Sequence, residues 1–483
     1  MTDPSVDRLV NAILVPGLCK AAVPGWLARE IGAGLRSVCW FGGRALAQLA
    51  HDFPGVMVMA DEEGGTVTRI DMATGSPWPG NAALGALDDV SATVRIAAGI
   101  AATARRAGIG IALAPVVDVN SEPENPVIGV RSFGDDPALV ARHGAAFVRG
   151  VQSQGVAACA KHFPGHGATR TDSHLSLPVV DADRETFLRR DVAPFAAAVD
   201  AGVRCILTAH VSVPAVDATP ATMSSAWMAL LRDELRFDGV IISDALDMHA
   251  IAKGVGRGVG AVNALNAGVD LICIGNPCFP DPYDGEVVFA GVRRDILAAV
   301  EDGTLDVARL EQAAERVAAL AAWLAAAQTS VEPLADSALL VATALGRDVA
   351  TRTVNAVGDV RLATAPCVMV EQRPNIATGR LLSPVVAALT ARAPGTVSVT
   401  ARSPADASVA AALASDRPLV VVTDGLAGDA LVAHVRAARP DAVVVAVGPE
   451  PIARALFPAP AVFALGNGAA NAAAVADLLL GPA

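Results

Sequence analysis

The chain has 483 residues, of which 53% are hydrophobic and 18% charged, so it can bury a large core and exceeds one ordinary domain. Its net charge of −12, without a cluster of lysines and arginines, argues against a nucleic-acid-binding protein. Every apolar run is interrupted before it reaches the roughly 18 residues of a membrane helix, and Asp3 and Asp7 precede only a short apolar run. We therefore expect a cytoplasmic protein without a signal peptide, and with neither nucleic acid nor membrane as a partner.

Cysteine usage agrees with that location. The seven cysteines are scattered, and four of them, Cys39, Cys159, Cys205 and Cys273, lie in apolar stretches where a thiol acts as a small hydrophobic side chain. No Cys-x-x-Cys pair is present, and the spacing does not indicate a disulfide framework.

Strand-like stretches alternate with helical ones up to about residue 300. The eight predicted strands are Ala12–Val15, Ser37–Phe41, Val56–Ala60, Gly110–Val117, Val156–Ala160, Cys205–Thr208, Gly239–Ser243 and Asp270–Ile274. The helical patterns are Trp26–Arg36, Arg44–Ala50, Val90–Ala107, Pro137–Gln154, Arg184–Ala201, Ser225–Leu235, Ala250–Ala267 and Glu286–Glu301. Strict alternation predicts a parallel sheet, and eight units suit a closed (β/α)8 TIM barrel better than an open doubly wound sheet.

The pattern changes beyond about residue 303. Two long helices, Asp306–Ala327 and Ala335–Arg352, precede a second α/β series. Its predicted strands are Cys367–Val370, Val397–Thr400, Leu419–Val422, Ala442–Val447 and Val462–Leu465. We predict a catalytic barrel over residues 1–330 and a smaller C-terminal α/β domain with an open sheet over residues 331–483. This second domain has few histidines or clustered acids, so we expect it to serve packing or dimerisation.

Ionisable or polar side chains follow five of the predicted barrel strands. They are Asp61, Glu62 and Glu63 after the third strand, Asp118 and Asn120 after the fourth, Lys161 and His162 after the fifth, His210 after the sixth and Asp244 after the seventh. Barrel enzymes carry their chemistry at the C-terminal ends of the strands. These residues therefore predict one converging pocket.

Several of these residues have two interpretations. Asp244 is either a helix N-cap or, given its polar neighbours, a nucleophile or general base. Asp172 and His174 are either solvated loop residues or a proton shuttle in which the carboxylate orients the imidazole.

The cations of the predicted pocket are also ambiguous. Arg69, Arg131, Lys161 and His162 can donate hydrogen bonds to a substrate, although Arg131 and Lys161 can instead pair internally with Asp61 or Asp118.

The histidines are also candidate metal ligands. His162, His166 and His174 have side chains that ligate zinc, but their spacing crosses glycine and proline rather than one helical face. We therefore expect no catalytic metal and no cofactor.

The motifs resemble those of the family 3 glycoside hydrolases, in particular the β-N-acetylglucosaminidase branch. The matching stretches are DEEGG, WPGNAALGA, APVVDVN, NPVIGVRSFGDDP, KHFPGHG followed by DSH, and FDGVIISDALDM. They cover most of the first 280 residues in the family's order.

The resemblance implies a retaining exo-β-N-acetylglucosaminidase that acts on muropeptide or chitin-type oligosaccharides. Asp244 would be the nucleophile, and His174, oriented by Asp172, the general acid and base. The residues matching positions that hold the sugar hydroxyls are Asp61, Arg69, Arg131, Lys161 and His162. The chain departs from many relatives at Ala245, where they have a second aspartate, and carries Arg170 in the loop before His174.

Two other functions stay open at this point. Inorganic phosphate could replace water as the acceptor, which would make the protein a β-N-acetylglucosaminide phosphorylase, since a neutral histidine does not repel an anion as a carboxylate does. A non-catalytic carbohydrate-binding protein is the other alternative. The sequence is compatible with a monomer or a homodimer.

Overall fold

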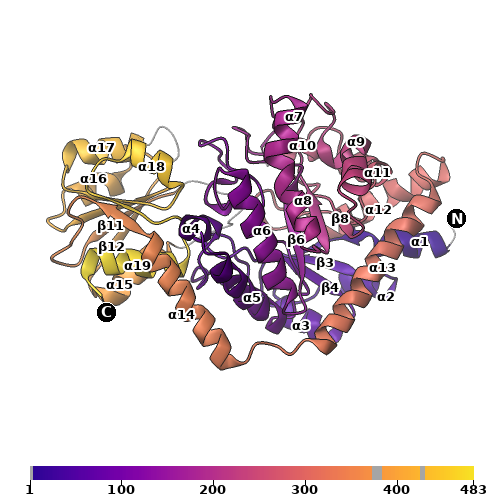
Figure 1. The fold of residues 1–483 in the computed structure, drawn as a ribbon, viewed down its shortest axis with the longest axis horizontal. Coiled ribbons are helices and arrows are strands. Elements are labelled where there is room, and N and C mark those ends of the chain that lie inside the picture. Colours follow the sequence, from indigo (N-terminus) through magenta and orange to yellow (C-terminus); the bar gives the residue numbers. More distant parts are fainter. Residues whose placement is uncertain (1–3, 174, 373–382, 425–429, 483) are drawn as a thin grey trace.

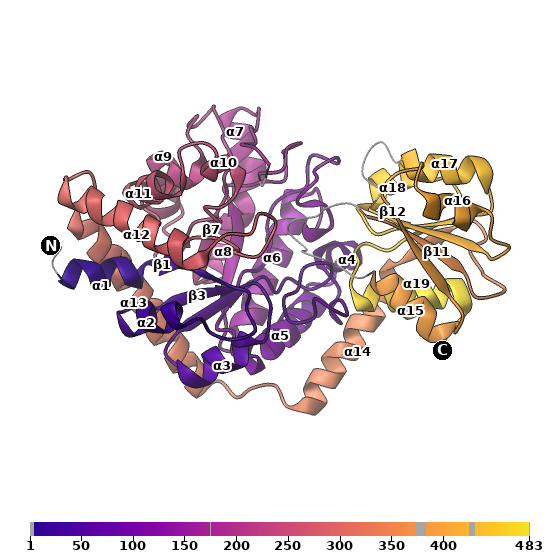
Figure 2. The same cartoon turned by 180° about the vertical axis from the view of Figure 1, so that it is seen from behind.

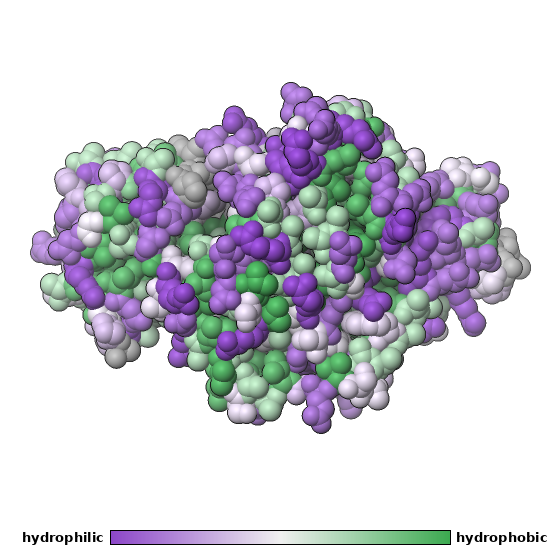
Figure 3. All heavy atoms as spheres, in the orientation of Figure 1, coloured by the Kyte–Doolittle hydropathy of each residue, from purple (hydrophilic) through white to green (hydrophobic). Residues whose placement is uncertain are grey.

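The structure is a computed structural model that describes residues 4–173, 175–372, 383–424 and 430–482. It is an α/β fold in which a barrel is followed by a smaller sheet with its own helices (Figures 1 and 2). Among the described helices, none combines the length and the apolar character needed to span a bilayer. Hydrophilic and hydrophobic side chains are mixed across both parts of the face drawn in Figure 3, as is usual for folded proteins.

The barrel is built from parallel strands. One sheet has the order β2 (Gly17–Leu18), β3 (Ser37–Trp40), β4 (Met57–Ala60), β5 (Ile111–Ala112), β6 (Ala157–Phe163), β7 (Cys205–Thr208) and β8 (Val240–Ile242). β1 (Leu14–Val15) pairs with β9 (Ile272–Cys273), and a single bridge between Ile242 and Leu271 links β8 to the start of β9. Since β1 and β2 are separated only by Pro16, these pairings close the ring. The predicted TIM barrel is confirmed.

Helices surround this ring, and several begin where an aspartate caps the first turn. They are α1 (Pro4–Ala12), α2 (Gly25–Gly32), α3 (Ala45–Asp52), α4 (Asn81–Leu87), α5 (Val90–Arg106), α6 (Pro137–Gln152), α7 (Arg184–Phe187), α8 (Ala193–Asp200), α9 (Ser225–Ala229), α10 (His249–Ala252), α11 (Arg257–Ala267), α12 (Gly285–Glu301) and α13 (Val307–Ser330). Asp89 accepts a hydrogen bond from Ala92 N–H, and Asp136 accepts one from Ala138 N–H. A carboxylate at this position satisfies an amide that has no partner within the helix.

The cysteines divide into two groups. Cys39, Cys159, Cys205 and Cys273 are buried in one apolar cluster with other inward-facing strand residues, as the sequence predicted. The expectation of a chain without disulfides is wrong, because Cys19 is bonded to Cys278. These two cysteines are 259 residues apart, and no short-range motif joins them.

The second sheet is open and has the order β10 (Asn355–Val357), β15 (Ala461–Phe463), β14 (Val443–Ala446), β13 (Leu419–Thr423), β11 (Cys367–Glu371) and β12 (Val397–Ala401). Its strands run parallel except β10, which is antiparallel to β15. The associated helices are α14 (Asp336–Thr353), α15 (Pro384–Arg392), α16 (Ala407–Leu413), α17 (Ala430–Ala438), α18 (Glu450–Leu456) and α19 (Ala469–Leu480). The predicted second α/β unit with an open sheet is confirmed.

The two parts meet at loops of the barrel. Ala469 N–H donates to the Ser76 carbonyl at 2.8 Å, and Asn467 N–H donates to Thr66 Oγ1 at 3.1 Å. Helix α14 packs against both α5 and α19. The proposed boundary at residues 330/331 falls between α13 and α14, and it stays a prediction.

Candidate active site

A cavity of about 460 Å³ lies at the C-terminal ends of the barrel strands. Its polar lining is Asp61, Arg69, Arg131, Lys161, His162, His166, Ser173, Asp244, Asp247 and Asn276. Apolar side chains, including Phe41, Met72, Met248 and Phe279, and the Cys19–Cys278 disulfide complete the wall. Six residues singled out in the sequence as a nucleophile or as sugar contacts therefore share one cavity.

Lys161 is the centre of an ion-pair network on one wall. It lies in β6, its side chain is only 2% exposed, and its Nζ is 2.7 Å from both Asp61 Oδ1 and Glu63 Oε1. Arg69 reaches the other oxygen of Asp61 at 2.7 Å. Arg131 forms two hydrogen bonds with Glu63, of 3.0 and 2.9 Å. The internal pairing considered for Arg131 and Lys161 is thus present, with Glu63 rather than Asp118 as the partner of Arg131.

These contacts determine the charge states in the network. Burial alone would raise the pKa of Glu63, but Arg131 and Lys161 hold it below its usual value. Burial alone would lower the pKa of Lys161, but Asp61 and Glu63 raise it. Glu63 and Lys161 therefore stay charged at neutral pH. The network presents both donors and acceptors to the cavity.

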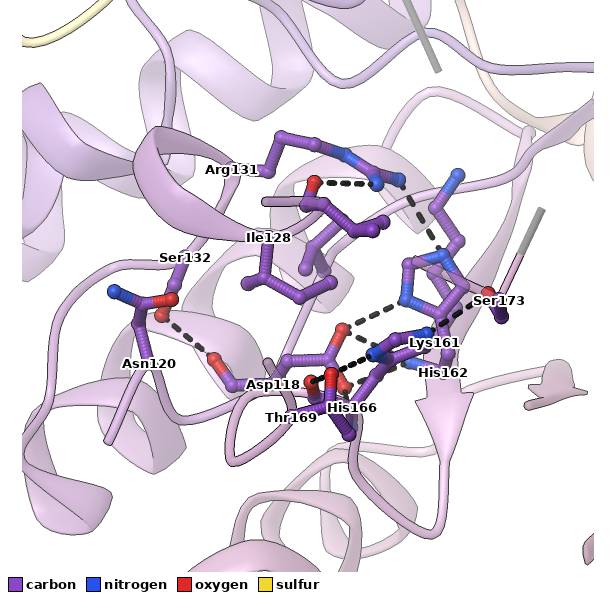
Figure 4. Close-up of polar contacts among 12 residues, drawn as sticks. Asp118, Asn120, Ile128, Arg131, Ser132, Lys161, His162, His166, Thr169 and Ser173 are labelled. Atoms are coloured by element: carbon purple, nitrogen blue, oxygen red, sulfur yellow. Dashed lines mark hydrogen bonds and ion pairs between the residues drawn. The ribbon is translucent and has the colours of Figure 1, made fainter. Parts of the chain in front are cut away.

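Asp118 links two histidines behind this wall (Figure 4). The ring Nδ1 atom of His162 is 2.7 Å from Asp118 Oδ2. The backbone N–H of His166 donates to Asp118 Oδ1 at 2.7 Å. The Nε2 atom of His162 lies 3.3 Å from a guanidinium nitrogen of Arg131. Burial would raise the pKa of Asp118, but the two histidines lower it. Asp118 therefore orients His162, which lines the cavity.

Asp244 follows β8 on another wall of the cavity. Its Oδ1 accepts a hydrogen bond from Ala245 N–H at 2.8 Å, and no residue in the described ranges forms an ion pair with it. The next helix, α10, begins only at His249 and has Met248 at its N-cap, so the N-cap interpretation of Asp244 is wrong. The backbone beside it is held by His210, whose Nε2–H donates to the Ala245 carbonyl at 3.0 Å.

The predicted proton shuttle lies in the long loop after β6. Asp172 is partly buried, and its carbonyl accepts hydrogen bonds from Leu175 and Ser176 N–H. Its neighbour Ser173 lines the cavity. His174 lies outside the described residues, so its role stays a prediction. Arg170, the departure noted in this loop, pairs with Glu122 at 2.8 Å.

Sequence reasoning placed Glu63 in the converging pocket and considered His166 as a zinc ligand, but it named neither as a catalytic or sugar-binding residue. It did not single out Asp247 or Asn276. Asp247 accepts a hydrogen bond from Asn276 N–H at 2.6 Å, which joins the loops after β8 and β9. The sequence did hold one signal for Glu63 and Asp247. Each lies within a matching motif, close in sequence to Asp61 and Asp244, respectively. Within the described ranges, no group of three or more metal-binding side chains is arranged to hold an ion.

Comparison with known proteins places the chain in a family. Residues 47–320 match the model of the glycosyl hydrolase family 3 N-terminal domain. A β-hexosaminidase A from Pseudoalteromonas piscicida is 39% identical over 47% of this chain, and the chain spans only 41% of that relative's length. A β-hexosaminidase from Xylella fastidiosa strain M23 is 36% identical over 53% of this chain and 76% of its own.

A solved structure resembles almost the whole chain. The family 3 β-N-acetylglucosaminidase from Paenibacillus sp. str. FPU-7 superposes with a TM-score of 0.84 and 30% identity, over 98% of this chain and 96% of its own. Because the family model covers more than half of the chain, the chain belongs to glycosyl hydrolase family 3.

Proposed function

We propose that the protein is a retaining exo-β-N-acetylglucosaminidase. It removes terminal N-acetylglucosamine from muropeptide or chitin-type oligosaccharides through a glycosyl ester on Asp244. The observation that carries this proposal is that Asp244 shares one cavity with Asp61, Arg131 and Lys161. The names of the β-hexosaminidase relatives and of the Paenibacillus β-N-acetylglucosaminidase support the choice of sugar.

The charged network is suited to bind sugar hydroxyls. Asp61 already binds both Lys161 and Arg69, so a hydroxyl can accept from a cation and donate to a carboxylate without leaving a buried charge unpaired. Arg131, which is held by Glu63, and His162 extend this surface. Holding the ring in one orientation presents its anomeric carbon to the nucleophile.

The reaction proceeds in two displacements. The Asp244 carboxylate attacks the anomeric carbon while the bond to the leaving oxygen breaks, and His174 donates a proton to that oxygen. A water molecule then attacks the same carbon, His174 accepts its proton, and the ester bond to Asp244 breaks. Histidine suits both steps because its unperturbed pKa, about 6.5, lies near neutral pH. Asp172 serves to orient it.

Water is favoured over phosphate as the acceptor. Arg69, Arg131 and Lys161 each have a carboxylate partner. Asp244 and Asp247 add negative charge to the cavity, which disfavours a second anion beside the sugar.

Proton NMR of the first product tests the proposal. With 4-nitrophenyl β-N-acetylglucosaminide as substrate, we expect the β-anomer of N-acetylglucosamine to form first, in phosphate buffer as well as without phosphate. Initial release of the α-anomer would reject the double displacement. Accumulation of the sugar 1-phosphate in phosphate buffer would instead identify a phosphorylase.

A further inference from the structure

Ser173 is buried in a segment, residues 170–176, whose other described side chains are exposed or half-buried. Arg170 and Thr171 on one side and Leu175 and Ser176 on the other are exposed, Leu175 to 62%, whereas Ser173 is only 1% exposed. Small polar side chains in such loops ordinarily face solvent. Burial of this one residue indicates that the loop is attached to the barrel at Ser173.

The attachment point is the ring of His166 (Figure 4). The Nε2 atom of His166 lies 2.9 Å from Ser173 Oγ, and its Nδ1 atom lies 2.8 Å from Thr169 Oγ1. Burial lowers the pKa of His166 to about 4, so the ring is neutral at pH 7 and has one donor and one acceptor. The Thr169 hydroxyl donates to the His166 carbonyl at 3.0 Å, which leaves it to accept from Nδ1–H. Nε2 therefore accepts the hydroxyl hydrogen of Ser173.

The backbone N–H and the backbone carbonyl of His166 are both hydrogen-bonded. Its N–H donates to Asp118 Oδ1 at 2.7 Å, and its carbonyl accepts from Asn125 Nδ2 at 2.8 Å. A Cβ atom on Gly167 would lie 1.8 Å from the Val119 carbonyl oxygen, so only glycine permits this close approach to the loop after β5. Since Asp118 also orients His162, one carboxylate connects the sugar-contacting side chain with the support of Ser173.

We propose that His166 and Ser173 are positioning residues for the proton-transfer step, because their hydrogen bond sets the place of the loop between Asp172 and residue 174. This inference rests on the proposed function, which gives those two neighbours their roles. His166 and Ser173 need not touch the reacting atoms themselves. The effect of their bond should be specific to proton transfer and should leave the sugar contacts on β4 and β6 in place.

The test compares aryl β-N-acetylglucosaminides whose leaving groups range from dinitrophenol to unsubstituted phenol. Good leaving groups depart without a proton, so loss of acid catalysis lowers kcat/KM only for the poor ones. Ser173→Ala should lower kcat/KM for the phenyl substrate about tenfold or more, within the range of general acid catalysis, and leave the dinitrophenyl value within about twofold. Ser173→Thr, which keeps the hydroxyl, should restore the phenyl rate.

Two further variants make the result interpretable. Ser212→Ala is the matched control, because it also removes a buried serine hydroxyl, one bound to the Ala218 carbonyl in the loop after β7. It should show no dependence on the leaving group. His166→Leu removes the acceptor from the other side and should reproduce the pattern of Ser173→Ala, which keeps the test decisive if one variant does not fold.

The variant His174→Ala distinguishes a failure of the positioning role from a failure of the proposed function. If it shows the leaving-group dependence while Ser173→Ala and His166→Leu lower kcat/KM equally for all substrates or for none, the positioning role is wrong and the proposed function stands. If His174→Ala shows no such dependence, the assigned acid is wrong, and the inference falls with it.

Discussion

Glu63 is the acid on which the ion-pair network depends. It binds Arg131 through two hydrogen bonds and Lys161 through one ion pair, and its side chain is 3% exposed. Replacing it with glutamine leaves two buried cations short of a partner. Breaking a buried ion pair in this way typically costs about 3–5 kcal/mol.

We therefore expect Glu63→Gln to lower the free energy of unfolding by about 3 kcal/mol or more and to weaken binding of the sugar. Denaturant unfolding measures the first effect. The matched control is Glu286→Gln, which breaks the exposed pair with Arg29 and should cost under about 1 kcal/mol. Equal losses in the two variants would show that the buried network adds no stability.

The adjacent Glu62 has the opposite electrostatic environment. Its carboxylate accepts hydrogen bonds from Ile70 N–H at 2.6 Å and from Thr68 Oγ1 at 2.9 Å, but burial raises its pKa from 4.5 to about 7. Between these two values the unfolded chain loses the proton while the folded chain retains it. The wild-type protein therefore loses stability through Glu62 as the pH rises from about 5 to about 7.

Glu62→Gln should remove this pH dependence. We expect the free energy of unfolding of the variant, relative to wild type, to increase by about 2–3 kcal/mol between pH 5 and pH 7. For Glu63 both states are ionised over this range, because its folded pKa is lowered, so Glu63→Gln should show a constant difference. Denaturant titrations at each pH measure the difference in free energy of unfolding between each variant and wild type. A flat difference for Glu62→Gln would contradict the assigned environment.

The strands and helices were predictable where local periodicity determines them. All eight barrel strands occur close to their predicted positions, because each is a buried apolar run between polar turns. The strand predicted at Gly110–Val117 is only Ile111–Ala112, since Pro115 has no N–H for the ladder. The helix predicted at Ala250–Ala267 is divided into α10 and α11, and Gly256 between them has a φ of 85°. The edge strand β10 was missed because it is short and only half-buried.

The disulfide beside the closure of the barrel is the element-scale feature that the sequence did not reveal. Only two residue pairs join β1 to β9, and the Cys19–Cys278 disulfide links the loops that follow β2 and β9. A cross-link over such a long stretch restricts the unfolded chain and typically contributes about 2–4 kcal/mol. Sequence spacing alone could not show that the two thiols are adjacent.

Reducing this bond should destabilise the protein. We expect a phosphine reductant to lower the thermal midpoint of the wild type, and Cys278→Ser to start from the lower value and not respond further. The five other cysteines are buried and serve as an internal control, since Cys367→Ser should keep the response to reductant. A wild-type midpoint that does not change on reduction would contradict a stabilising disulfide.

At the scale of the whole molecule, the second α/β unit contacts the barrel loop between Asp61 and Arg69, two of the proposed sugar contacts. Asn467 N–H binds Thr66 Oγ1, and Gly468 lies against Gly65, within the turn between Asp61 and Arg69. The composition of this unit led us to expect a role in packing or dimerisation, and that expectation did not include a contact with this loop. The sequence could not reveal it, because residues 401 positions apart share no periodic pattern.

Gly468→Ala tests whether this contact supports sugar binding. Its φ of −86° suits any residue, but an added Cβ would lie 2.9 Å from the Gly65 carbonyl oxygen, so the turn must shift. We expect KM to rise several-fold with kcat little changed, measured with 4-nitrophenyl β-N-acetylglucosaminide. Gly55→Ala, which meets no atom within 4 Å, is the matched control. An unchanged KM for Gly468→Ala would limit the second unit to packing.

The site was predictable to the extent that chemistry follows strand ends. Asp61, Lys161 and Asp244 were expected to converge because parallel strands of a barrel direct their C-terminal ends to one side. Glu63 was expected in the same pocket, but its pairing with Arg131 was not, and neither was the bond between His166 and Ser173. Both contacts depend on burial and on three-dimensional neighbours. The cysteine argument for a cytoplasmic location fails with the Cys19–Cys278 bond, since disulfides persist mainly in oxidising compartments, and the location stays a prediction.

The central claim is that Asp244 forms a covalent bond to the sugar. The most direct measurement is mass spectrometry of the protein after incubation with 5-fluoro-β-N-acetylglucosaminyl fluoride, whose good leaving group allows the first displacement while the ring fluorine slows the second. We predict one added glycosyl group, located by peptide sequencing on Asp244 and absent from Asp244→Asn. A label on any other residue, or turnover without a covalent species in the intact enzyme, would contradict the mechanism.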